Sequence, residues 1–130
     1  MLVDTDVMID ILRKYPPSLA WLSSLKHEEI GIPGFVAMEL LQGCRNGTEQ
    51  KQVEKLLRPY QFYWPNPVDC QRAFFDYSNY YLSHKLGIID AIIAETAVGM
   101  DMKLATFNEK HYCVVNNLQI IQPYIRQSIG

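Results

Sequence analysis

The chain alternates short apolar segments with longer segments in which apolar residues recur at helical spacing. The short segments predict strands at residues 2–4, 29–32, 61–64 and 103–106, with a fifth at 114–115 or 120–121. The longer segments predict helices over residues 7–12, 19–25, 33–44, 49–57, 68–86 and 90–98. Strands that alternate with helices in this way indicate an α/β fold with a parallel sheet covered on both faces. We expect a single domain spanning residues 1–130.

Prolines, glycines and polar residues predict where the helices begin and end. Pro16-Pro17 is expected to stop the first helix, and Ser18 to cap the second. Pro33 opens the third helix, since proline is favoured in a first turn. Thr48 is the expected N-cap of the fourth, and Gly87 is expected to break the long fifth helix.

Composition narrows the class of protein. Of 130 residues, 48% are hydrophobic and 20% are charged, as in a globular domain. No apolar run approaches the roughly 20 residues of a membrane span, and no signal-peptide pattern opens the chain, so we expect a cytoplasmic location. A net charge of −2 argues against nucleic-acid binding by charge alone. The three cysteines lack zinc or disulfide spacing and are expected to be reduced and mostly buried: Cys44, Cys70 and Cys113.

Three acidic residues each interrupt an apolar run. Asp4 follows Leu2-Val3, Glu39 divides an apolar helix, and Asp90 separates Ile88-Ile89 from Ala91-Ile92-Ile93-Ala94. A charge in a core is costly unless it is paired or binds a metal, and none of these runs contains a basic residue. Two carboxylates about 4 Å apart repel by about 4 kcal/mol at an effective dielectric of 20. Three acids of one sign therefore predict a shared cation.

The predicted topology brings these acids to one edge of the sheet. Sites in parallel α/β sheets form at the carboxyl ends of the strands, where Asp4 and Asn108 fall; Asp90 opens a helix and Glu39 reaches the edge from another. Oxygen ligands without a histidine or thiolate pattern favour Mg²⁺ or Mn²⁺ over zinc. Such an ion can activate water and stabilise a phosphoryl displacement.

Each acid also has a purely structural interpretation. Asp4 and Asp90 could cap or open helices, and Glu39 could face solvent. Asp6 could either complement a helix dipole or touch the metal site. We expect two further acids, Glu95 and Asp101, to lie at the surface.

Four motifs, in order, resemble those of PIN-domain proteins. They are Leu2-Val3-Asp4-Thr5-Asp6-Val7-Met8-Ile9; Ile32-Pro33 through Glu39-Leu40-Leu41-Gln42-Gly43; Ile89-Asp90-Ala91-Ile92-Ile93-Ala94 with Ala97; and Leu104-Ala105-Thr106-Phe107-Asn108 with Lys110-His111-Tyr112. The small size is most similar to VapC-type toxins of bacterial toxin–antitoxin systems.

The resemblance implies a three-layer α/β/α sandwich and a Mg²⁺- or Mn²⁺-dependent endoribonuclease. It implies catalytic acids at Asp4, Glu39 and Asp90, with Thr5 orienting Asp4 or a water, and it places Asp6 and Thr106 as supporting residues. It also implies a homodimer and an antitoxin that covers the active-site groove. Many relatives carry an acid where this chain has Asn108, so the site has one charge fewer and both one-metal and two-metal chemistry stay open.

RNA contacts must come from local features of an otherwise acidic chain. Six basic residues near predicted element ends could form a rim: Arg13, Lys14, Arg45, Lys85, Lys103 and Lys110. Three aromatic residues could stack on bases: Tyr15, Phe107 and Tyr112.

Other functions fit parts of the pattern. A haloacid-dehalogenase-like phosphatase would use Asp4 as nucleophile and Asp6 as general acid, but it leaves Glu39 unexplained. A non-catalytic RNA- or protein-binding module needs none of the three acids. DNA cleavage also stays open, because a metal site recognises the phosphodiester rather than the sugar.

Overall fold

A computed structural model describes residues 1–127 of the chain. Its strands are β1 (Leu2–Val3), β2 (Gly31–Pro33), β3 (Gln61–Tyr63), β4 (Leu104–Ala105) and β5 (Ile120–Ile121). Its α-helices are α1 (Thr5–Leu12), α2 (Pro16–Ser23), α3 (Gly34–Gln42), α4 (Gly47–Leu57), α5 (Pro67–Tyr80), α6 (Ile88–Gly99) and α7 (Glu109–Tyr112). A short 3-10 helix, η1 (His27–Glu29), precedes β2.

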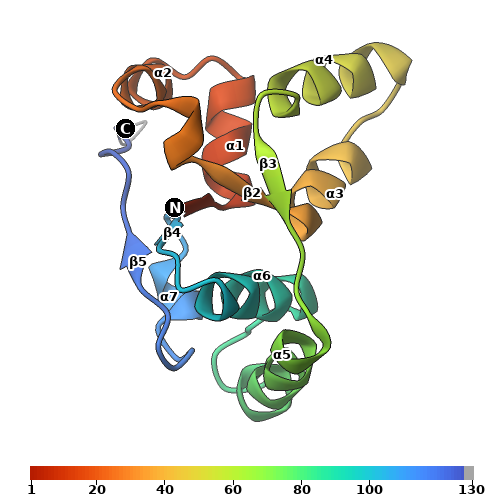
Figure 1. Cartoon of the computed structure of the whole chain (residues 1–130), viewed down its shortest axis with the longest axis vertical. Helices are drawn as coiled ribbons and strands as arrows, with labels where there is room; N and C mark the ends of the chain where they lie inside the picture. Colours follow the sequence, from red (N-terminus) through yellow and green to blue (C-terminus); the bar gives the residue numbers. More distant parts are fainter. Residues whose placement is uncertain (128–130) are drawn as a thin grey trace.

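The five strands form one parallel sheet in the order β3-β2-β1-β4-β5. The chain first steps from β1 to β2 and β3, and it then crosses to β4 on the other side of β1. In Figure 1, α1 to α4 lie together in the upper half of the view and α5 to α7 in the lower half. This is the expected three-layer α/β/α sandwich. The strand order reverses between β1 and β4, which is where ligands bind in folds of this kind.

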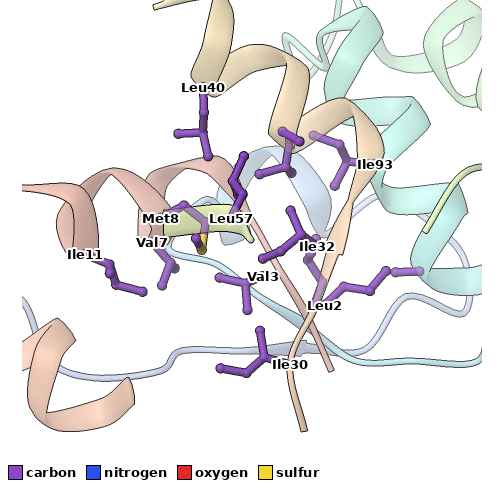
Figure 2. Close-up of a cluster of buried hydrophobic side chains, with 14 of the residues drawn as sticks. Leu2, Val3, Val7, Met8, Ile11, Ile30, Ile32, Leu40, Leu57 and Ile93 are labelled. Atoms are coloured by element: carbon purple, nitrogen blue, oxygen red, sulfur yellow. The ribbon is translucent and has the colours of Figure 1, made fainter. Parts of the chain in front are cut away.

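The main core lies between the sheet and the helices α1, α3, α4 and α6, the last through Ile93, Ala94 and Ala97. Leu2 and Val3 of β1 are fully buried, which explains why a two-residue strand suffices to anchor the sheet. Figure 2 shows them surrounded by apolar side chains of neighbouring elements, among them Val7, Met8, Ile11, Ile30, Ile32, Leu40 and Leu57. Burial of such side chains contributes roughly 1.5–3 kcal/mol each. The core thus fixes the carboxyl end of β1, where Asp4 follows.

Several predicted boundaries are wrong. α1 does end before Pro16-Pro17, at Leu12, but these prolines open α2. Ser18 is therefore not the cap of that helix; it is buried within it, and its hydroxyl donates to the Tyr15 carbonyl at 2.6 Å. Asn46, not Thr48, caps α4, because its side chain accepts from the Glu49 N–H at 2.9 Å. The fifth helix ends at Tyr80, six residues before the predicted end at residue 86.

The prediction that Glu95 is a surface acid is also wrong. Glu95 is 3% exposed in α6, and Arg72 of α5 donates to it from Nε at 2.9 Å. The same guanidinium donates to Asp69, also buried, at 2.6 Å. Burial, reinforced by a hydrogen bond with Glu95, raises the pKa of Asp76 to about 7. One arginine therefore compensates a group of acids between the two helices.

Cys70 and Cys113 are exposed and Cys44 is half-buried, so the expectation of mostly buried thiols is wrong. Asp101 is exposed, as predicted. Among the described residues, no helix is both long and apolar enough to cross a membrane.

Arg72→Ala should lower the free energy of unfolding by about 2 kcal/mol, because it leaves buried carboxylates without their cation. The Arg72 side chain is 38% exposed, which keeps the loss below that of a fully buried pair. Urea unfolding at pH 7 measures it. Arg58→Ala, an exposed arginine at the C-cap of α4, is the matched control and should change little. Equal stability of the two variants would contradict the role of Arg72.

Candidate active site

An open hollow of about 360 Å³ lies where the strand order reverses, beyond the carboxyl ends of β1 and β4. It is lined by all the candidate ligands from the sequence: Asp4, Glu39, Asp90 and Asn108. These residues come from four different places in the fold, namely the end of β1, helix α3, the first turn of α6 and the loop after β4. The structure therefore brings the four together.

Asp4 is the most buried acid of the hollow, at 5% exposed. Its Oδ1 accepts from the Thr5 N–H at 2.8 Å, so Asp4 is the N-cap of α1 as well as a wall of the hollow. Its Oδ2 accepts from the Thr106 hydroxyl at 2.7 Å. Burial, followed by the nearby charge of Asp6, raises the pKa of Asp4 to about 7. The structural and metal-ligand interpretations of Asp4 are therefore compatible.

Thr5 links Asp4 to Glu39. Its backbone N–H contacts Asp4, while its hydroxyl donates to Glu39 Oε1 at 2.7 Å. Glu39 is half-buried, and the apolar run around it is not wholly in the core, because Met38 is 53% exposed. Thr5 thus sets the Glu39 carboxylate toward the hollow rather than toward solvent.

Asp90 lies in the first turn of α6, which begins at Ile88 after the N-cap Gly87. The Tyr112 hydroxyl donates to Asp90 Oδ1 at 3.4 Å. Tyr112 is fully buried, which excludes the predicted base-stacking role for it. Burial, followed by the charges of Asp4 and Asp90, raises the pKa of Tyr112 far above its usual range, so the hydroxyl stays a proton donor. At Gly87 a Cβ would lie 3.2 Å from Asp90 Oδ2, so glycine leaves room for the carboxylate.

The loop after β4 forms another wall of the hollow, through Phe107 and Asn108. Thr106 has one hydroxyl proton, which goes to the nearer Asp4, and its oxygen accepts from the Asn108 N–H at 3.0 Å. Asp6 accepts from the Phe107 N–H at 3.0 Å. Burial raises the pKa of Asp6. Asp6 therefore ties α1 to this loop and is not a fully solvated acid.

Sequence patterns missed one residue of the hollow, Arg126. It follows β5, outside every motif, and only the tertiary fold reveals it. None of the six predicted rim residues lines this hollow among the described residues, but four line hollows that share a residue with it. Arg13 and Lys14 line one that shares Arg126, Arg13 and Arg45 line one that shares Glu39, and Lys85 lines one that shares Glu39 and Asp90.

The oxygen donors do not form a closed cage. Within residues 1–127, no group of three or more His, Cys, Asp or Glu side chains has the arrangement to hold a metal ion. Asp4 and Glu39 are instead held by hydroxyl donors from Thr106 and Thr5.

A family model for the PIN domain matches residues 1–116. This chain belongs to the PIN-domain family. Two curated relatives from Mycobacterium tuberculosis agree. Ribonuclease VapC10 is 33% identical over 121 residues, which cover 92% of this chain and 90% of the relative. Ribonuclease VapC19 is 31% identical over 122 residues, which cover 91% of this chain and 96% of the relative.

Solved structures confirm the PIN fold. A toxin–antitoxin complex from Klebsiella pneumoniae matches with a TM-score of 0.76 and 21% identity, covering 95% of this chain and 97% of the other. VapBC2 from Rickettsia felis, bound to a promoter DNA fragment, matches with a TM-score of 0.74 and 20% identity, covering 92% and 96%. The PIN assignment made from the four motifs is thus confirmed.

Proposed function

We propose that this PIN domain is a divalent-metal-dependent endoribonuclease and the toxin of a toxin–antitoxin pair. The observation that carries the proposal is the meeting of Asp4, Glu39 and Asp90, from three separate elements, in one open hollow. The relatives named ribonucleases support RNA as the substrate. PIN membership leaves the haloacid-dehalogenase-like phosphatase without support.

The donor types in the hollow suit a hard divalent cation, although the acids of residues 1–127 do not form a preassembled cage. Their donors are carboxylate and amide oxygens, which suit Mg²⁺ or Mn²⁺. The raised pKa of Asp4 shows that its burial beside Asp6 disfavours the ionised form, which a cation would reverse. Asp4, Glu39 and Asp90 would hold the ion, with Asn108 as a neutral oxygen donor. When bound, such an ion supplies an activated water and charge stabilisation at a phosphodiester.

The chain's own hydrogen bonds prepare these donors. Thr106 and the Thr5 N–H hold the two oxygens of Asp4, and the Thr5 hydroxyl orients Glu39. Tyr112 orients Asp90 from a buried position. Burial and the nearby carboxylates raise the pKa of Tyr112 still further above neutral pH, so its hydroxyl remains a donor. Hydrogen bonds from the protein therefore fix the three acids, while the open side of the hollow can receive a strand of RNA.

Asn108→Asp should tighten Mn²⁺ binding by roughly 10-fold, because it adds a carboxylate to the hollow. Isothermal titration calorimetry measures the change. Asn117→Asp is the matched control: Asn117 is exposed in the turn before β5, at the opposite edge of the sheet, and its φ of 67° suits aspartate equally well. Unchanged affinity in Asn108→Asp would place this residue outside the ligand set.

The proposed partners are an antitoxin and a second copy of the chain, acting in the cytoplasm. The structural neighbours include toxin–antitoxin complexes. Helix α5 also exposes large apolar side chains, with Phe74 at 66% and Phe75 at 60%. Exposed apolar surface of this kind is typical of a binding face.

A growth experiment tests the toxin role. Expression of the chain alone should slow bacterial growth, whereas equal amounts of Asp4→Asn should not. Equal growth of the two strains, with both proteins detected at equal levels, would contradict the role. Purified protein offered RNA and DNA oligonucleotides of one sequence should cut the RNA; cleavage of DNA alone would replace the ribonuclease proposal with a deoxyribonuclease.

A further inference from the structure

Arg126 places a cation at the rim of the acidic hollow. Among the described residues that line this hollow, it is the only lysine or arginine. The segment that carries it follows β5 and runs toward α2 (Figure 1). Its side chain is 42% exposed, so it is accessible to a ligand in the hollow.

The guanidinium of Arg126 is fixed by contacts on several sides. Its Nε donates to Asp10 Oδ2 at 3.0 Å, and its Nη2 donates to the Asp6 carbonyl at 3.3 Å. It also lies 4.0 Å from the centre of the Phe107 ring, in a cation–π contact. The same Asp10 oxygen accepts from the Tyr124 hydroxyl at 2.7 Å. Arg126 is therefore held in place by α1 and the loop after β4.

These contacts leave hydrogen-bonding capacity unused. A guanidinium carries five N–H donors. Within residues 1–127, two of them have partners, at Asp10 and Asp6. The side chain is paired with Asp10 rather than with Asp4, Glu39 or Asp90, so it does not replace the cation that those acids need. Free donors in a planar fork suit a phosphate group.

A second hollow, of about 690 Å³, adjoins the first at Arg126. Its lining includes Arg13 and Lys14 in addition to Arg126, with Asp10 as its acid. Arg126 is common to the linings of both hollows. Positive side chains thus continue from the acidic hollow across the surface beside α1 and α2.

We propose that Arg126 is a substrate-binding residue that receives an RNA phosphate next to the one being cleaved and directs the strand into the Arg13–Lys14 hollow. This inference rests on the proposed ribonuclease function and assigns the path of its substrate. Arg126 contacts the phosphate, and Asp10 and Phe107 hold the Arg126 side chain in position. The chain has a net charge of −2, so local cations of this kind are what can attract the RNA backbone.

The test compares the wild-type chain with Arg126→Ala, Arg126→Lys and Arg58→Ala. In steady-state cleavage of an RNA oligonucleotide, Arg126→Ala should raise KM about 10-fold and change kcat less than about 3-fold. Arg126→Lys keeps the positive charge and should raise KM less than Arg126→Ala does. Arg58→Ala should match the wild type, because Arg58 ends α4 ahead of β3, at the opposite edge of the sheet.

A salt series gives a readout that a purely structural role would not change. Binding of the same RNA is measured in EDTA by fluorescence anisotropy, from low salt upward. Loss of one phosphate contact should reduce the slope of log K against log salt by about 0.7 in Arg126→Ala. An unchanged slope with an unchanged KM would overturn the proposal. So would faster cleavage by Arg126→Ala, which would show that the arginine obstructs the site.

The two proposals fail in different ways. If the wild-type chain does not cleave RNA but binds it with a slope that Arg126→Ala reduces, the nuclease function fails and Arg126 stands as an RNA contact. If the wild-type chain cleaves RNA and Arg126→Ala equals it in KM and slope, only the inference about Arg126 fails. If the wild-type chain neither cleaves RNA with Mg²⁺ or Mn²⁺ nor binds it at any salt, both proposals fail.

Discussion

Asp90→Asn should lower the rate of RNA cleavage by about 10³-fold or more, an increase of about 4 kcal/mol in activation free energy. The change removes one negative charge from the hollow and keeps the shape of the side chain. An asparagine oxygen can still accept from the Tyr112 hydroxyl, which reaches Asp90 at 3.4 Å. The fold should therefore survive, and circular dichroism with thermal unfolding checks that it does.

Asp101→Asn is the matched control for this loss. Asp101 is exposed and precedes β4, at the edge of the sheet opposite the hollow. Its φ of 53° is one that asparagine adopts as readily as aspartate. This variant should cleave at the wild-type rate. A folded Asp90→Asn protein that retains more than about a tenth of the rate would remove Asp90 from the catalytic set.

Asp4→Asn should make the metal-free protein more stable at pH 8, by about 2–4 kcal/mol, while abolishing its activity. Burial raises the pKa of Asp4 from 3.8 to about 7 in the folded chain. The folded state therefore holds a proton that the unfolded state releases, so wild-type stability falls as the pH rises from about 4 to 7. Asparagine is neutral throughout and avoids this loss.

Urea unfolding in EDTA at pH 4, 6 and 8 measures the effect. The gain of Asp4→Asn over the wild type should be small at pH 4, grow through pH 6 and level off above 7. Added Mn²⁺ should narrow the gap, because it binds and stabilises the wild type more strongly. A gain that does not change with pH would contradict the proposed cost of burying this carboxylate, and Asp101→Asn should show no such pH trend.

The fold could be predicted from the sequence because its signals are local. Leu2 and Val3 form a fully buried strand and are followed at once by an acid, as the apolar run indicated. Ile120–Ile121, one of the two candidates for the fifth strand, pairs with β4. Boundaries were less predictable where two polar residues compete for one cap, as Asn46 and Thr48 do.

The site was only partly predictable, because its partners are distant in sequence. Asp90 and Glu95 interrupt the same apolar helix, yet only Asp90 lines the hollow, since Arg72 on α5 pairs with Glu95. Helical spacing puts the two acids about 140° apart around α6, but it does not show that Arg72, on another helix, buries and pairs Glu95. Arg126 likewise reaches the hollow through contacts with Asp10 and Phe107, residues far from it along the chain.

The proposed activity is divalent-metal-dependent cleavage of RNA in the acidic hollow. Its most direct test is cleavage of total bacterial RNA by the purified chain, in parallel with Mg²⁺, Mn²⁺ or EDTA and beside Asp90→Asn. Discrete cuts are expected with either metal, none in EDTA and none from the variant. Equal cutting in EDTA, equal cutting by Asp90→Asn, or no cutting by the folded wild-type protein with either metal would contradict the proposed activity.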